Sequence, residues 1–189
     1  MKKIFLTVLT LVAVCGMSSC GSSKSVQTPP PSGMVEETIP LSGAEYHSDA
    51  NYYRAVQNAA SSDRSMAQKM AMQNCRQELA ANIQAEMKLV IENYAKAQST
   101  QFGEDVKGQY QELAYTAINQ RMVDVQVVGE KLYKETNGNF RYYVCLQLPK
   151  KSIEEAMMAI AEGSAQLNLE IDLEMFKRIF EEQMAAYDK

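Results

Sequence analysis

The sequence of 189 residues is poor in the side chains that most chemistry needs: it has one histidine, four cysteines and no tryptophan. A single imidazole disfavours histidine-rich metal sites, and four cysteines disfavour multi-cysteine zinc modules. Positive charge is also in deficit, with 19 Lys and Arg against 23 Asp and Glu, so the chain lacks the basic surface of a nucleic-acid binder. Its content of 46% hydrophobic and 22% charged residues is nevertheless typical of a globular protein. We therefore expect one domain with no cofactor, no metal and no nucleic-acid partner.

The first residues have the pattern of a secretory signal peptide. Lys2 and Lys3 precede an apolar run over residues 4–14, and small residues follow it. The run is shorter than the roughly 20 residues that a membrane-spanning helix needs. Residues 1–19 are therefore predicted to be a signal peptide.

The segment Met17-Ser18-Ser19-Cys20-Gly21 resembles the lipobox of bacterial lipoproteins. The resemblance implies cleavage before Cys20 and attachment of a diacylglycerol to its thiol. Cys15 is the rival position, but the bulky Val14 directly before it does not suit the cleavage site. Since no aspartate follows Cys20, an anchor in the outer membrane is favoured over the inner membrane by analogy. Which face of the membrane carries the domain stays open.

Residues 20–43 contain four of the five prolines and are otherwise rich in Ser, Gly and Thr. Such a segment buries too little apolar surface to order itself, and Pro29-Pro30-Pro31 favours extended polyproline II. We predict a spacer between the lipid and a single domain over residues 44–189.

The domain begins with a short predicted strand over residues 50–56, and a helix from Asp63 to about residue 98 follows. Apolar residues recur along one face of this helix at spacings of three and four: Leu79, Ile83, Met87, Val90 and Tyr94. At about 35 residues it would be about 50 Å long. We expect such a helix to project from the fold or to pair with another chain. A second helix is predicted over residues 104–120.

After residue 120, apolar residues recur at every second position, the period of a β-strand. Val123, Val125 and Val127 alternate with polar residues, and Gly129 marks a candidate bulge. Asn137-Gly138 predicts a hairpin turn before a return strand over residues 140–148. A capping-box pattern at Ser152 predicts a helix over residues 152–162, and a last helix is expected over 169–187. The order β-α-α-β-β-α-α predicts an α+β fold, in which the N-terminal strand and the hairpin form a small antiparallel sheet with helices over one face.

Several of these segments together resemble the LPP-twenty family of bacterial lipoproteins. They are the lipobox, Tyr52-Tyr53-Arg54-Ala55-Val56 before the Ala-rich helix, Val127-Val128-Gly129-Glu130-Lys131, and Tyr142-Tyr143-Val144 before a Pro-Lys helix start. Gln57 replaces the glycine that usually follows the first of these strands. The resemblance implies a membrane-associated lipoprotein with a compact α+β domain, of a kind linked to envelope surfaces, adhesion or flagellar accessory structures. It carries over no catalytic residues.

Two adjacent tyrosine pairs, Tyr52-Tyr53 and Tyr142-Tyr143, lie on predicted strands. Neighbouring strand residues point to opposite faces, so one member of each pair must point away from the core. We assign Tyr53 and Tyr143 to an exposed surface suited to contact with a partner or a glycan.

The remaining candidates for chemistry are isolated. His47 is predicted to lie at a polar surface, and the acidic pairs, such as Glu154-Glu155, are predicted on solvated faces. The sequence leaves open whether Cys75 and Cys145 form a disulfide or are free thiols.

We therefore expect a non-catalytic, membrane-anchored lipoprotein of the cell envelope that acts in interaction, adhesion or envelope assembly. Its partner would be an envelope protein or a second copy of the chain. The alternatives are a small-ligand or lipid carrier and, less favoured, an envelope hydrolase that uses carboxylates.

Overall fold

The computed structural model describes residues 33–35, 37–98, 104–163 and 172–186. The chain divides into two compact units, residues 1–37 and residues 38–189. Every helix and strand of the described residues belongs to the second unit. Cys20 and the predicted signal peptide lie outside the described residues. The second unit starts at Thr38 rather than at residue 44, and it includes Leu41, which is buried.

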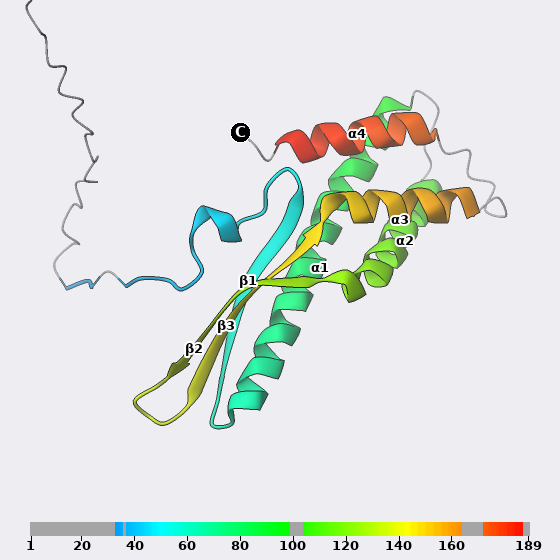
Figure 1. The fold of residues 1–189 in the computed structure, drawn as a ribbon. Coiled ribbons are helices and arrows are strands. Elements are labelled where there is room, and N and C mark those ends of the chain that lie inside the picture. The colour runs from blue at the N-terminus through cyan, green and yellow to red at the C-terminus, as the bar shows by residue number, and fades with distance from the viewer. Residues whose placement is uncertain (1–32, 36, 99–103, 164–171, 187–189) are drawn as a thin grey trace, which may run out of the picture. The chain divides into compact units, whose positions relative to one another are not determined.

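Three antiparallel strands form the sheet, in the order β1-β3-β2 (Figure 1). The strands are β1 (Tyr52–Ser61), β2 (Gln126–Lys134) and β3 (Phe140–Pro149). The predicted α+β fold and its element order are confirmed, because the N-terminal strand pairs with the return strand of the hairpin. Gly138 lies in the hairpin turn with φ of 91°, a conformation that glycine adopts without strain.

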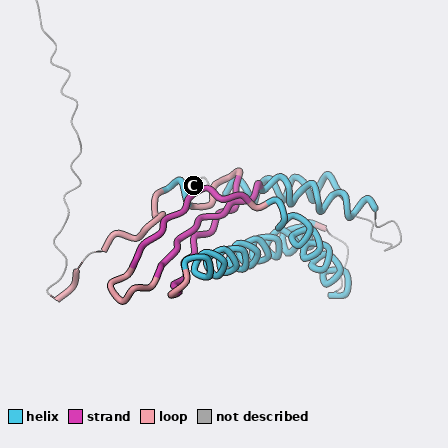
Figure 2. The backbone as a smooth tube through the Cα atoms, turned by 60° about the horizontal axis from the view of Figure 1, so that its bottom comes forward, coloured by secondary structure: helices cyan, strands magenta, loops and turns pink. Residues whose placement is uncertain are grey.

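Four helices accompany the sheet: α1 (Arg64–Ala97), α2 (Glu104–Arg121), α3 (Lys150–Gly163) and α4 (Leu173–Ala185). Two short 3-10 helices, η1 (Ala44–Tyr46) and η2 (Met122–Asp124), precede β1 and β2. Figure 2 shows α1 running along one face of the sheet, and Figure 1 shows α2, α3 and α4 gathered near the far end of α1.

Helix α1 is the longest element, and its two halves pack against different parts of the fold. Asp63 caps it by accepting a hydrogen bond from the Met66 amide at 2.7 Å. The first half presents small residues to the sheet, among them Cys75, whose thiol donates to the Ala55 carbonyl at 3.0 Å. The second half packs against α2 and α4, where Tyr94 contacts Tyr110 and Phe176. The expectation that this helix projects from the fold is therefore wrong, and its pairing with another chain stays a prediction.

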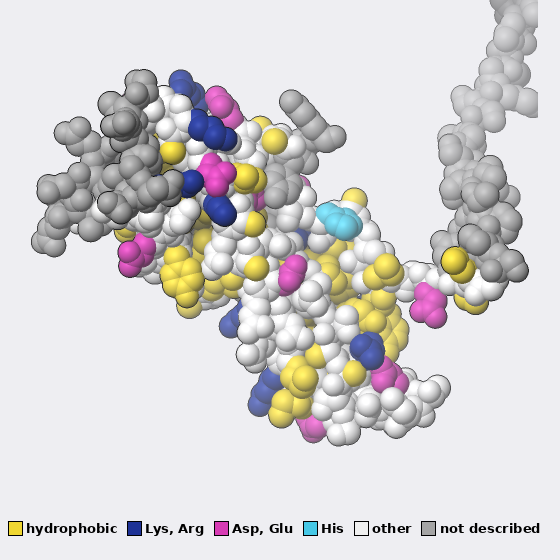
Figure 3. Space-filling view, turned by 180° about the vertical axis from the view of Figure 1, so that it is seen from behind, with side chains coloured by type: hydrophobic (Ala, Val, Ile, Leu, Met, Phe, Trp, Pro, Cys, Tyr) yellow, Lys and Arg dark blue, Asp and Glu magenta, His cyan; other side chains and the backbone are white. Residues whose placement is uncertain are grey.

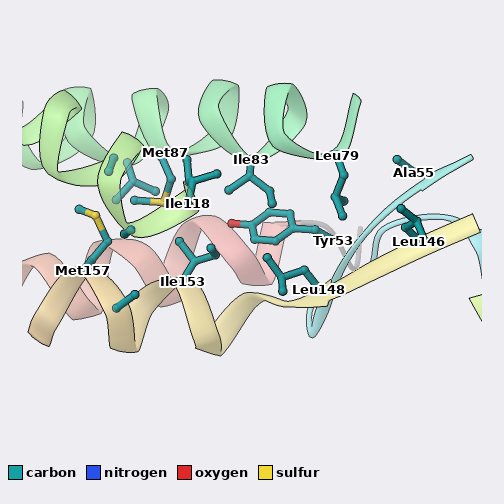
Figure 4. Packing of buried hydrophobic residues seen from close by; sticks show 14 of the residues in the cluster. Tyr53, Ala55, Leu79, Ile83, Met87, Ile118, Leu146, Leu148, Ile153 and Met157 are labelled. Carbon is teal, nitrogen blue, oxygen red and sulfur yellow. The ribbon is translucent and has the colours of Figure 1, made fainter. Parts of the chain in front are cut away.

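The core lies between the sheet and the helices (Figure 4). The predicted apolar face of α1 is confirmed, since all five of its residues are almost fully buried. Leu146 and Leu148 of β3 meet this face from the sheet, and Ile153 joins them from α3. Alternate residues of the return strand are buried in the core, namely Tyr142, Val144, Leu146 and Leu148.

Four element boundaries differ from the predictions, the first being that of β1, which ends at Ser61 and not at residue 56. Val123 belongs to η2 and is 79% exposed, so β2 begins only at Gln126. Helix α3 begins at Lys150, and the Ser152 hydroxyl donates to the Pro149 carbonyl inside the first turn instead of capping the helix. Helix α4 begins after Asp172, whose side chain accepts from the Met175 amide. The predicted irregularity at Gly129 is confirmed by a shift in register between Val127 and Gly129.

No helix among the described residues is long and apolar enough to cross a membrane.

Candidate functional site

The outer face of the sheet, opposite α1, carries one tyrosine of each predicted pair. Tyr52 and Tyr143 point to this face and are partly exposed. Tyr53 points to the core, opposite Leu148, and only 1% of it is exposed. The assignment of Tyr53 to a partner surface is therefore wrong, because alternation fixes that neighbours differ in face but does not say which one faces the helices. The assignment of Tyr143 to the outer face agrees with the structure.

Aromatic and basic side chains alternate on this face, and we call Tyr52, Arg54, Tyr133, Arg141 and Tyr143 the outer aromatic patch. The Arg54 guanidinium lies over the Tyr52 ring, 5.1 Å from its centroid. Tyr133 and Tyr143 meet edge to face with centroids 5.8 Å apart. Such rings offer apolar area and hydroxyl groups together, which is a composition typical of binding surfaces.

Both arginines of the patch are held by neighbouring groups. Arg54 binds Asp49 at 2.5 Å and the Gln147 amide oxygen at 3.2 Å. Burial alone would raise the pKa of Asp49, but Arg54 and two backbone amides outweigh it, so the pKa of this carboxyl is lowered. Arg141 binds Glu135 at 2.5 Å. The guanidinium groups are therefore fixed near the sheet surface, which reduces the entropy that a partner must remove on binding.

The segment before β1 covers another part of the outer face. Leu41 and Tyr46 approach Gly129 so closely that a side-chain Cβ there would lie 2.6 Å from the Tyr46 ring. The Cys145 thiol lies 3.8 Å from the Tyr46 carbonyl oxygen. This cover explains why Cys145 is fully buried although it points away from the helices.

The two described cysteines are both free and buried. Cys75 contacts the helix-facing side of the sheet, whereas Cys145 lies on the outer side, so no disulfide joins them. Burial raises the pKa of each thiol to about 11. Both thiols are therefore protonated at neutral pH, and neither has the character of a reactive nucleophile.

A buried ion pair joins α1 to the start of α3. The Lys150 ammonium lies 3.4 Å from a carboxylate oxygen of Glu86, and both side chains are at most 3% exposed. The same ammonium lies 5.0 Å from the centroid of the Tyr53 ring. Sequence reasoning missed this cluster. The available signal was the position of Glu86, which is three and four residues from Ile83 and Val90 and so lies on the apolar face of α1.

A pocket of about 380 Å³ opens beside this ion pair. Lysines 150, 151 and 177 line it together with Glu154, Glu181 and the apolar side chains of Phe180 and Met184. Lys177 lies 3.9 Å from Glu154 and 4.0 Å from Glu181, so it pairs with both carboxylates. Burial raises the pKa of Glu154 despite Lys177. The pocket thus combines apolar side chains with three lysines and two glutamates.

Glu154 is predicted on a solvated face, but its side chain is only 13% exposed and lines this pocket, so that prediction is wrong. His47 is exposed, and Figure 3 shows the side chain of this only histidine at the surface. No group of three or more potential metal-ligating side chains gathers among the described residues. Comparison with models of protein families and with curated proteins finds no match for this chain.

Proposed function

We propose that this protein is a membrane-anchored lipoprotein of the bacterial cell envelope whose α+β domain is a non-catalytic binding module. The observation that carries the proposal is the sequence around Cys20, which has the form of a lipobox and precedes a proline-rich segment. The compact unit begins at Thr38, beyond the three consecutive prolines of that segment. The resemblance to the LPP-twenty family supports the same function, with the outer membrane as the favoured location.

The outer aromatic patch is the part of the domain that supports binding of an envelope partner. Tyrosine and arginine are enriched at protein interfaces, where they dominate the binding energy. Figure 3 shows hydrophobic side chains interspersed with charged ones over the molecular surface. A partner of the patch would present apolar groups and acceptors for the tyrosine hydroxyls and the arginines.

Substitution of the lipobox cysteine tests the anchor. The full-length Cys20→Ala variant is expected to lose all incorporation of a fatty-acid label fed to the cells, because its side chain has no thiol to carry the lipid. The measurement is in-gel detection of the label after purification of the protein, with membrane fractionation as a second readout.

Cys15→Ala is the matched control and should retain the full label, since this residue lies inside the predicted signal peptide. The anchor proposal is contradicted if the wild-type protein takes up no label, or if Cys20→Ala keeps it.

A small-ligand carrier is the second candidate function, favoured by the pocket beside Lys150. A fatty acid would place its chain against Phe180 and Met184 and its carboxylate beside Lys177. Lys177→Ala is expected to weaken binding of dodecanoate about five-fold, the effect of losing about 1 kcal/mol from one exposed charge contact. Isothermal titration calorimetry measures the dissociation constant.

Arg178→Ala is the control for this pocket, because Arg178 is the next residue on α4, pairs with Glu182 and is absent from the pocket lining. Equal effects of the two substitutions, or no heat of binding with the wild type, would exclude this pocket as a fatty-acid site.

A further inference from the structure

Strand β2 is exposed along almost its whole length, unlike the other two strands. Helix α1 packs against β1 and β3, so β2 lies beside it rather than over it. Four apolar side chains of β2 are 38–47% exposed: Val127, Val128, Leu132 and Tyr133. An edge strand with this character is a template for a further strand.

The two edge strands of the sheet, β1 and β2, differ in whether their outward backbone groups are hydrogen-bonded. On β1, the Ser48 hydroxyl bonds both the amide and the carbonyl of Arg54, and Asp49 bonds the backbone of Tyr52. The outward backbone groups in this part of β1 are thus already paired. On β2, no hydrogen bond within the described part of the chain reaches the outward side of the strand. The open edge is therefore that of β2.

The hairpin register tells which residues of β2 direct their backbone groups outward. The Glu135 amide donates to the Asn139 carbonyl at 2.8 Å, one step beyond the pair Lys134 and Phe140. Opposed residues in an antiparallel pair alternate between bonded and non-bonded pairs. Bonds to β3 therefore come from residues 131 and 133, while Glu130, Leu132 and Lys134 direct their amides and carbonyls to the open edge.

These three residues complement themselves in an antiparallel arrangement centred on Leu132. Glu130 of each copy then lies opposite Lys134 of the other copy, which gives two equivalent pairs. The two Leu132 side chains lie opposite each other. Lys131 lies opposite Tyr133 on the other face, which permits a cation–π contact. In this register Glu130, Leu132 and Lys134, whose backbone groups point to the open edge, lie opposite one another and can form hydrogen bonds between the copies. A register centred on Glu130 would instead place two carboxylates opposite each other, which is unfavourable.

We propose that a second copy of this chain binds at the β2 edge, with a two-fold axis through Leu132, and that the two sheets join into one of six strands. The backbone pairs contribute about six hydrogen bonds, two for each of the three bonded pairs. The Glu130–Lys134 pairs fix the register. The proposal does not depend on the lipid anchor.

A single engineered cysteine tests the register. In the purified full-length protein in detergent, Leu132→Cys should give a disulfide-linked dimer on mild oxidation, because Cα atoms of a bonded pair are about 5.5 Å apart, within the range for a disulfide. Gln126→Cys on the same strand is the control and should give none, since its copies would be about 40 Å apart at 3.3 Å per residue. The wild type, with the same native cysteines, supplies the baseline on a non-reducing gel.

Exchange of the opposed charges tests the pairing independently. Glu130→Lys alone or Lys134→Glu alone should weaken the dimer about ten-fold, because each change turns two attractive pairs into repulsive ones. The double exchange E130K/K134E should restore wild-type association, as measured by sedimentation of the full-length protein. Circular dichroism checks that each variant is folded.

The proposal is overturned if Leu132→Cys gives no more dimer than the wild type, or if Gln126→Cys gives as much. It is also overturned if the double exchange associates no better than the single variants. A Leu132→Cys product in cell membranes with a mass other than twice that of the chain would assign the edge to a different protein.

Discussion

Lys150→Met should lower the free energy of unfolding by about 3–5 kcal/mol, because it leaves the Glu86 carboxylate buried without its cation. Lys150 and Glu86 are only 2% and 3% exposed, so the Glu86 carboxylate keeps little hydration when the lysine is removed. The ammonium also lies above the Tyr53 ring, and that contact is lost with it. Urea denaturation followed by circular dichroism measures the change.

Two controls make this result specific to the buried pair. Lys151→Met changes the neighbouring residue, whose side chain is 79% exposed and lies 3.9 Å from Glu155, and it should cost less than about 1 kcal/mol. The double variant E86L/K150M should recover most of the lost stability, since it removes both charges and keeps apolar volume. A cost below about 1 kcal/mol for Lys150→Met would mean that the pair is hydrated in solution.

Tyr53→Ala should cost about 3–5 kcal/mol of stability, the usual effect of truncating a buried aromatic side chain. Its ring packs among core residues, and its hydroxyl lies 3.6 Å from the Met184 sulfur. Tyr143→Ala, on the opposite face, should cost about 1 kcal/mol or less, which is typical of a partly exposed position. Thermal and urea denaturation compare the two variants directly.

The same pair of variants separates packing from binding. Tyr143→Ala should stay folded and yet lower the yield of cross-links to the proposed envelope partner in cells, because it removes one of the two rings of the Tyr133–Tyr143 contact. Similar stability losses for Tyr53→Ala and Tyr143→Ala would contradict the placement of the two residues on opposite faces. An unchanged cross-link yield would remove Tyr143 from the proposed surface.

Local patterns of the sequence predicted most of the elements, because they depend on short-range physics. The spacing from Leu79 to Tyr94 selects one face of a helix whatever packs against it, and Asn137-Gly138 favours a hairpin turn by its own backbone preferences. The prediction that Val123 lies in a strand was wrong, because the alternation of apolar and polar residues begins already in η2, before the chain enters the sheet. The prediction that Ser152 caps a helix was wrong, because the same capping-box pattern can lie inside the first turn of a helix that has already begun.

The candidate surfaces could be located only from the three-dimensional arrangement. Tyr53 and Tyr143 each have a tyrosine neighbour, so the sequence could not decide which ring is covered by α1. Lys150, the partner of Glu86, lies 64 residues away in the sequence, and no pattern near either residue indicates that the two pair. The open edge of β2 follows from the strand order β1-β3-β2, which sequence adjacency alone does not specify.

By itself the sequence determined the element order, the apolar face of α1 and the hairpin, since each depends on residues close together in the chain. It also contains, around Cys20, a segment that resembles a lipobox, and this resemblance rests on the linear sequence alone. Only the tertiary structure decided that α1 is covered along both halves, that Tyr53 is core and that β2 is an open edge. These properties depend on which distant segments pack together, because burial belongs to the assembled layers and not to any one strand or helix.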